Sequence, residues 1–302
     1  AERVTIRCQA RAEATRCCRG PVLFQDRLVG LIMEREGGFR GEVVLAENTH
    51  RGSKPWERTG WAVPFERNSD LEGIANYGDL ARSLKERYAG RFSVCHLVDV
   101  ASGGRRVFGP QDGPGYVFCD GTGGVPRLAV DNGLDGETRR EAVLSYPVLR
   151  TDRGTIIDYR WGVWEGGAYT GRPVKFVNCA ALNHHSAYCG MTSAVKNYLG
   201  VCDLSGGSDP AAKGPIPGSR NFHAFAFDGN RKGPRPGMLG KAVGAFLKMV
   251  RKPFLNITTA EVCGLASRLE PPVAWTKAIL ASADPVALDV HAAKHVLFAN
   301  SR

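Results

Sequence analysis

Residues 174–200, VKFVNCAALNHHSAYCGMTSAVKNYLG, carry the strongest fold signal in this 302-residue chain. The apolar run Val174–Cys179 is typical of a buried central strand. A loop with two histidines and a glycine follows, and residues 192–199 are predicted to form a short helix. Strand ends that face helix N-termini form the usual ligand crevice of open α/β sheets. We therefore expect a binding site here, and the helix amides would favour an anion.

The rest of the chain alternates predicted strands and helices, which indicates a parallel sheet with right-handed crossovers. Residues 155–164 alternate apolar and polar side chains and predict a β-ribbon. We expect an α/β fold with a mainly parallel sheet, helices on both faces and this β-ribbon insertion. Residues 1–302 would form a single domain or two lobes around a cleft. The other expected elements are strands Arg3–Cys8, Glu42–Ala46 and Phe92–Val100, and helices at residues 22–35, Asp79–Tyr88 (with Asp79 as N-cap), Leu239–Val250 and from Asp284 onward.

The composition is 43% hydrophobic and 23% charged, as in an ordinary soluble globular protein. No run of 18 apolar residues occurs, so we expect no membrane span. The net charge is +10, but the basic residues are scattered, with small clusters at Arg231–Arg235 and Arg251–Lys252. A nucleic-acid binder would concentrate this charge on one face. The charge therefore favours a small anionic ligand or an acidic protein partner, and nucleic acid is not expected.

Nine cysteines occur without a C-x-x-C pair, which excludes a ferredoxin-type iron–sulfur motif and the usual zinc-ribbon spacing. Most lie in apolar runs, so we expect buried thiols and no extensive disulfide framework. The vicinal pair Cys17–Cys18 is the exception, with redox or soft-metal chemistry as the alternative. The chain opens on Ala1. We expect a cytoplasmic protein, or an exported one if Ala1 is a processed terminus.

Two Gly/Pro-rich stretches, Ser205–Arg220 and Asp228–Gly237, flank a short apolar segment, Phe222–Phe227, that reads as a strand. Loops of this length in a compact domain usually cover or complete a site. We therefore expect them to fold over residues 184–197 and to bring His223 within reach of the crevice.

Three stretches carry a family resemblance: residues 177–200 with their Lys-Asn-x-x-Gly ending, His223 within NFHAF, and residues 279–298, ILASADPVALDVHAAKHVLF. Together they resemble the bacterial and archaeal family known as domain of unknown function 362. RVTIRC and EVVLAEN resemble its first two strands more weakly. The chain departs from the family where the first strand usually ends in Lys-Pro-Asn. It also lacks the ferredoxin module that many relatives carry.

The residues of the crevice suggest roles in chemistry. Lys196 could clamp an anion, form a Schiff base or anchor a cofactor covalently. Of the two adjacent histidines, His185 is the candidate acid, base or metal ligand, because histidine titrates near neutral pH. Thr192 and Asn197 are expected on the same short helix as substrate-binding residues, with Thr192 on the face of Lys196.

The order of histidine, glycine, lysine and later histidine is similar to that of lactate racemase and its relatives. In that family a lysine covalently holds a nickel pincer nucleotide, and histidines act as acid and base. The matching positions here would be His185, Lys196 and His223. This similarity implies that a metal or a covalently held cofactor is possible, without naming one.

The last helix contains further candidates. Asp284 followed by proline is the pattern of a helix N-cap, with substrate binding as the alternative. Asp289 would complement the helix dipole or contribute to the site. His291 and His295 have the spacing of a metal pair, but no carboxylate shares their face.

Two functions of different classes follow. The first is an enzyme that acts on a small anionic substrate, with His185, Lys196 and His223 as catalytic groups. Lys196 and Arg220 would hold a carboxylate or phosphate while the two histidines exchange its proton. The second is a non-catalytic binding or accessory subunit that docks a partner through its basic loops.

Overall fold

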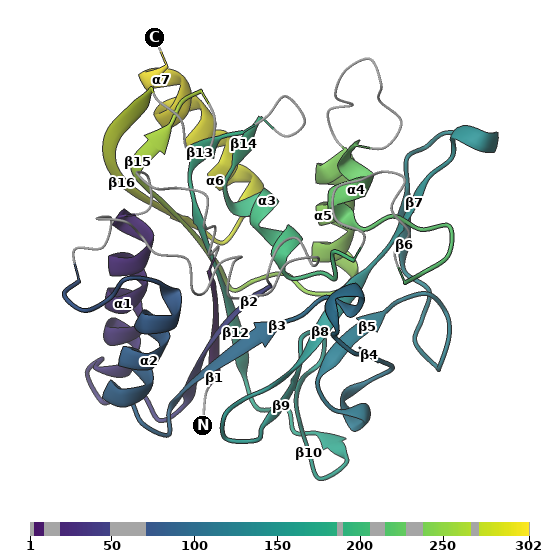
Figure 1. The fold of residues 1–302 in the computed structure, drawn as a ribbon, viewed down its shortest axis with the longest axis horizontal. Helices are drawn as coiled ribbons and strands as arrows, with labels where there is room; N and C mark the ends of the chain where they lie inside the picture. Colours follow the sequence, from purple (N-terminus) through teal and green to yellow (C-terminus); the bar gives the residue numbers. More distant parts are fainter. Residues whose placement is uncertain are drawn as a thin grey trace.

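The fold is seen in a computed structural model of the chain (Figure 1). The residues described are 3–8 (backbone only), 19–48, 71–185, 190–205, 215–227, 238–266 and 272–301. Within these ranges no helix is long and apolar enough to cross a membrane.

The main sheet has six strands in the order β16-β15-β12-β1-β2-β3. β1 lies between β12 and β2 and runs parallel to both, and β3 and β15 extend this parallel arrangement. β16 pairs with β15 in the antiparallel direction. The strands are β1 (Arg3–Cys8), β2 (Glu42–Asn48), β3 (Phe92–Leu97), β12 (Val174–Ala181), β15 (Leu255–Gly264) and β16 (Val273–Ser282).

A second six-stranded sheet, in the order β11-β10-β9-β8-β5-β4, is antiparallel except for the β4–β5 pair. Two antiparallel ribbons, β6–β7 and β13–β14, complete the β structure described. These strands are β4 (Arg106–Val107), β5 (Gly115–Phe118), β6 (Ala129–Asp131), β7 (Glu141–Val143), β8 (Ser145–Arg150), β9 (Ile156–Asp158), β10 (Gly162–Glu165), β11 (Ala168–Tyr169), β13 (Asn183–His184) and β14 (Met191–Thr192).

The expected α/β fold, a mainly parallel sheet with helices on both faces and a β-ribbon insertion, is therefore wrong. The main sheet is mixed, and most strands of the middle third belong to a separate, largely antiparallel sheet. The reason is connection length. The short turns between β8, β9 and β10 allow only antiparallel pairing, because a parallel neighbour needs a longer crossover. The predicted ribbon at residues 155–164 is β9–β10, and it is one part of this sheet.

The helices are α1 (Arg19–Met33), α2 (Tyr77–Arg87), α3 (Ala194–Asn197), α4 (Phe222–Phe227), α5 (Met238–Met249), α6 (Pro285–Ala292) and α7 (Phe298–Asn300). A π-helical turn, Ala293–Leu297, joins α6 to α7. α1 packs against α2 and β15, while α3 and α6 contact each other and the strands of the main sheet. Figure 1 shows α1 and α2 together on the left of the sheet and α3, α4 and α5 to its right.

Two local expectations are wrong for identifiable reasons. The N-cap of α2 is Asn76, whose side-chain oxygen accepts from the Asp79 amide, so Asp79 lies in the first turn instead. The apolar segment Phe222–Phe227 is a helix and not a strand. A short apolar run does not distinguish the two by periodicity. Here Asn221 decides it, because its side chain accepts from the Ala224 amide at 2.7 Å and starts the helix.

One hydrophobic cluster spans both large sheets. It joins Val44 and Phe176 of the main sheet with Tyr146 and Leu149 of the second sheet, and α5 contributes Phe246. A separate cluster lies under α1 and α2, and a small third one lies under α6. The two sheets therefore share a continuous core.

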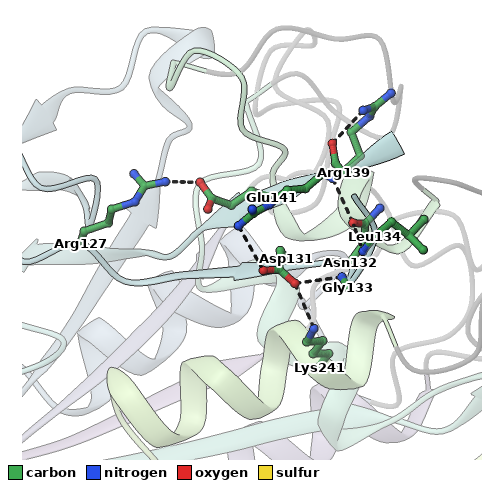
Figure 2. A network of polar contacts seen from close by, with 9 residues as sticks. Arg127, Asp131, Asn132, Gly133, Leu134, Arg139, Glu141 and Lys241 are labelled. Carbon is green, nitrogen blue, oxygen red and sulfur yellow. Dashed lines mark hydrogen bonds and ion pairs between the residues drawn. The ribbon is translucent and has the colours of Figure 1, made fainter. Parts of the chain in front are cut away.

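The β6–β7 ribbon is tied down by surface charges (Figure 2). Asp131 accepts from the Gly133 amide and pairs with Arg139 and with Lys241 of α5. These contacts, the amide first, lower the pKa of Asp131. Glu141 pairs with Arg127 through its side chain and accepts through its carbonyl from the Arg220 amide at 2.8 Å. The ribbon thus places Arg220 by backbone contact.

Asp284 caps α6 as predicted: its Oδ1 accepts from the Val286 amide at 2.8 Å and the Ala287 amide at 3.1 Å. The same bonds, Ala287 first, lower its pKa. Replacing Asp284 with Ala should lower the thermal unfolding midpoint by about 2 °C, because two helix amides lose their acceptor. Asp284→Asn keeps an acceptor and is the matched control in a differential scanning measurement. An Ala variant with an unchanged midpoint would contradict the capping role.

Candidate functional site

The sequence-predicted crevice begins where β12 ends, at Ala181 in the main sheet. The chain continues into the β13–β14 ribbon, in which the His185 amide donates to the Gly190 carbonyl at 2.8 Å. Gly190 has φ +65°, in the left-handed region that favours glycine. The second strand of the ribbon, β14, leads directly into α3. His185 therefore follows the first strand of the ribbon, and Lys196 lies in the helix that follows the second strand.

Thr192 is a strand residue of β14, paired with Asn183, and α3 begins only at Ala194. The expected helix over residues 192–199 is therefore a four-residue α-helix followed by a 3₁₀ turn, Tyr198–Gly200. The idea that Thr192 and Lys196 share a helix face is wrong. Ribbon pairing of the β-branched threonine prevails over helix formation at this position.

The first amides of α3 already have an anionic acceptor. Asp289 of α6 accepts from the Ala194 amide at 2.8 Å and from the Val195 amide at 2.9 Å. Burial raises the pKa of Asp289, against the opposing effect of its bonds with Ser193, Val195 and Ala194. A substrate anion at this helix terminus would have to displace Asp289. Any anion site must instead use side chains such as Lys196.

His185 and Lys196 are both buried, each with 6% exposure. Burial lowers the pKa of His185 to about 3, and the positive charge of Lys196 and then His184 add to this effect. At neutral pH the His185 imidazole is therefore uncharged, beside a lysine ammonium. The structure thus brings together two of the three residues predicted to be catalytic.

Asn197 serves the fold. Its amide group donates to Asn178 Oδ1 at 2.6 Å and to the Cys179 carbonyl at 2.8 Å, which fastens α3 to β12. Asn178 in turn donates to Asn256 of β15, and Tyr198 donates to the same Asn256 oxygen. This chain of buried amides holds the helix that carries Lys196. The substrate-binding role expected for Asn197 stays a prediction.

Arg220 and His223 come from a different segment of the chain, at the start of α4. Arg220 lines a small cavity of about 20 Å³ with Asp203, Ser205 and Asn221, enough for a single water. His223 is buried on α4, at 7% exposure. The two long loops fall largely on residues 206–214 and 228–237, which lie outside the described residues. Closure of these loops and proton exchange between His223 and His185 stay predictions.

A buried acidic cluster that the sequence reading missed lies at the ends of β2 and β3. Asn48 is the last residue of β2, and Asp99 lies two residues beyond β3. The Asn48 amide nitrogen, with two N–H donors, lies within hydrogen-bond distance of three acceptors: Asp99 Oδ1 at 2.9 Å, the Tyr116 hydroxyl at 2.8 Å and the Cys202 carbonyl at 2.9 Å. A usable signal existed, because polar residues directly after buried parallel strands mark the ligand edge of a sheet.

Asp99 has Asp203 as its acidic neighbour. Burial, with the nearby Asp203 carboxylate, raises the pKa of Asp99 to about 7. Burial also raises the pKa of Asp203. The Asp203 carboxylate accepts from the Val100 amide at 2.7 Å, and Asp99 Oδ1 accepts from the Leu204 amide at 2.6 Å. The pair therefore holds a proton close to neutral pH, a property typical of functional carboxylates as well as of structural ones.

A bound metal or cofactor was left open by the sequence. Among the described residues, no three His, Cys, Asp or Glu side chains gather in a way that could hold a metal ion. His291 and His295 stack at 4.6 Å between ring centroids on the exposed side of the last helix. Intact-mass and elemental analysis of the native protein would test directly for a metal ion or a covalently held cofactor.

Five of the nine cysteines are described with their side chains, and all five are free, buried thiols: Cys95, Cys119, Cys179, Cys202 and Cys263. Burial is the main cause that raises the pKa of Cys95 and of Cys119 to about 12. Four cysteines remain, enough for two disulfides at most. A framework of three or more is therefore excluded, as predicted.

Fold and site together define a protein with a mixed α and β architecture and buried ionisable groups along the carboxyl edge of its main sheet. The model of one family, domain of unknown function 362, matches residues 121–294, which is more than half of the chain. The chain belongs to this family, as the sequence resemblance implied. No curated protein and no solved structure matches the chain.

Proposed function

We propose that this protein is an enzyme acting on a small anionic substrate, with His185 and Lys196 at the centre of its site. The observation that carries the proposal is the burial of an ammonium group beside an uncharged imidazole at the carboxyl end of β12. Strongly shifted histidines in such positions are candidates for functional groups.

The chemistry follows from the charges. The Lys196 ammonium attracts a carboxylate or phosphate, and His185 then lies beside the bound anion. A histidine whose pKa is about 3 is a weak base at neutral pH. Binding of an anion offsets the positive charge of Lys196, which raises the pKa of His185 toward the range in which it can accept a proton. Substrate binding would thus activate the base.

Arg220 and His223 belong to the proposal as the second cation and the second proton carrier. The buried Asp99–Asp203 pair offers a further acid at the same edge of the sheet. The alternative function, an accessory subunit that docks a partner through its basic loops, depends on residues 206–214 and 228–237 and stays a prediction.

The proposal is tested by following the His185 ring signals by NMR through a pH titration, with and without saturating malonate or inorganic phosphate. We expect the anion to raise the pKa of His185 by about one unit or more, as an opposite charge nearby does. Lys196→Met should raise this pKa without any anion, because a positive charge is removed, and should weaken anion binding at least tenfold.

Lys196→Arg is the matched control, because it keeps the positive charge and should keep anion binding within a few-fold. An unchanged pKa of His185 in the presence of either anion, together with equal anion affinity in Lys196→Met and wild type, would refute the proposal.

A further inference from the structure

A cavity of about 520 Å³ is lined by the β13–β14 ribbon and the C-terminal helical segment. Both elements lie in the upper left of Figure 1. Its wall includes His184 and Met191 of the ribbon, Leu265, and Ala293, Leu297 and Phe298. Small-molecule sites in proteins span roughly 300 to 1,000 Å³ and are mostly apolar with few polar groups. This cavity has that size and that composition.

The ribbon separates this cavity from the side chains of Asn183 and Thr192. His184 and Met191 form one cross-strand pair, and Asn183 and Thr192 form the next. Successive side chains of a strand point to opposite faces. His184 and Met191 therefore face the cavity together. On the other face, Asn183 accepts from the Gly264 amide at 2.9 Å.

The opposite wall is formed at a break in helical geometry. α6 ends at Ala292, and the π-helical turn Ala293–Leu297 widens the helix before α7 begins at Phe298. Ala293, Leu297 and Phe298 all border the cavity. π-helical turns are rare and occur frequently at functional sites, because the extra residue in the turn redirects side chains.

Among the described residues that line the cavity, His184 is the titratable one. Its Nδ1 is buried and has no hydrogen-bond partner within the described part of the chain, so Nε2 is the ring nitrogen that a ligand in the cavity can reach. The other lining side chains in the described part of the chain are apolar apart from Ser301, whose hydroxyl donates to the Phe298 carbonyl. The wall thus offers a large apolar surface and one imidazole.

We propose that this cavity binds a mainly apolar, ring-sized organic molecule whose single hydroxyl group meets the His184 imidazole. The apolar walls would hold the body of the ligand, and the hydroxyl can donate to or accept from the imidazole in either tautomer. The site does not depend on Lys196, so it stands or fails separately from the anion site.

The test uses two probes that differ by one hydroxyl, 2-naphthol and naphthalene, with binding to the full chain followed by probe fluorescence. Wild type should prefer 2-naphthol by about tenfold, which is what one net hydrogen bond is worth. His184→Phe keeps an aromatic wall and should abolish this preference while retaining naphthalene binding.

Ala293→Trp fills the cavity and should abolish binding of both probes, and Ala293→Leu serves as a milder filling if the larger residue prevents folding. Val290→Trp is the matched control, since Val290 is an exposed residue of α6 outside the cavity wall. Equal affinity of wild type for the two probes, or binding that survives both Ala293 substitutions, would overturn the proposal.

Discussion

Replacing Asp99 with Asn should stabilise the protein relative to wild type as pH rises from 4 to 7. The pKa of Asp99 is raised from 3.8 to about 7 in the folded state. Between these values the unfolded chain has released the proton and the folded protein still holds it. Wild-type stability therefore falls with rising pH in this window, and Asn, which does not ionise, removes that loss. The gain at pH 8 should be on the order of 4 kcal/mol.

The experiment compares urea unfolding of the two proteins at each pH from 4 to 8. The quantity compared is the difference in unfolding free energy between the two proteins at each pH. This difference is needed because His185 makes the stability of both proteins rise with pH, which is opposite to the effect of Asp99. Its pKa is lowered from 6.5 to about 3, so its contribution is lost as pH falls through that range. Asp99→Ala is the control: the Leu204 amide and Asn48 lose their acceptor, so this variant should be about 2 kcal/mol less stable than Asp99→Asn at every pH. A pH-independent difference between Asp99→Asn and wild type would contradict the shared burial of the two carboxyl groups.

Asp289→Ala should destabilise the protein by about 3 kcal/mol. The carboxylate accepts from the amides of Ala194 and Val195, so its removal leaves two helix donors without an acceptor. It also removes the bond between α6 and α3, the helix that carries Lys196. Anion binding should therefore weaken together with stability, because α3 loses this support.

Asp289→Asn is the matched control, because its single carbonyl oxygen can replace one of the two bonds and should give an intermediate loss in chemical denaturation. A loss below about 0.5 kcal/mol for the Ala variant would show that water serves these amides equally well. In that case Asp289 would be a candidate ligand of the site instead of a support of α3.

Local patterns predicted most of the elements near the site. The apolar runs Val174–Cys179 and Glu42–Ala46 are strands, and the 3.6-residue spacing in Leu239–Val250 marks a helix. The Asp-Pro pair at Asp284 marks the start of α6. These succeed because burial and capping act within a few residues. The prediction of a strand at Phe222–Phe227 was wrong. A short apolar run suits a strand or a helix equally well, and the Asn221 cap decides in favour of the helix.

Sheet topology was not contained in these patterns. Strand propensity does not say which strands pair, and the division into a mixed sheet and a largely antiparallel one depends on how the cores of both sheets fit together. In the site, the sequence identified His185 and Lys196 as neighbours along the chain. It did not identify the electrostatic coupling between the buried carboxyl groups of Asp99 and Asp203, which are separated by more than a hundred residues.

By itself, the sequence determined the family, the histidine–lysine segment, the cap of the last helix and the absence of a large disulfide framework. Each of these rests on residue identity or on contacts between near neighbours in the chain. Only the tertiary structure decided that Asp289 occupies the first amides of α3, that Asp99 shares its burial with Asp203, and that a cavity lies behind His184. Those features depend on distant segments meeting in a low-dielectric interior, where burial sets the pKa of each group and no local pattern records the partner.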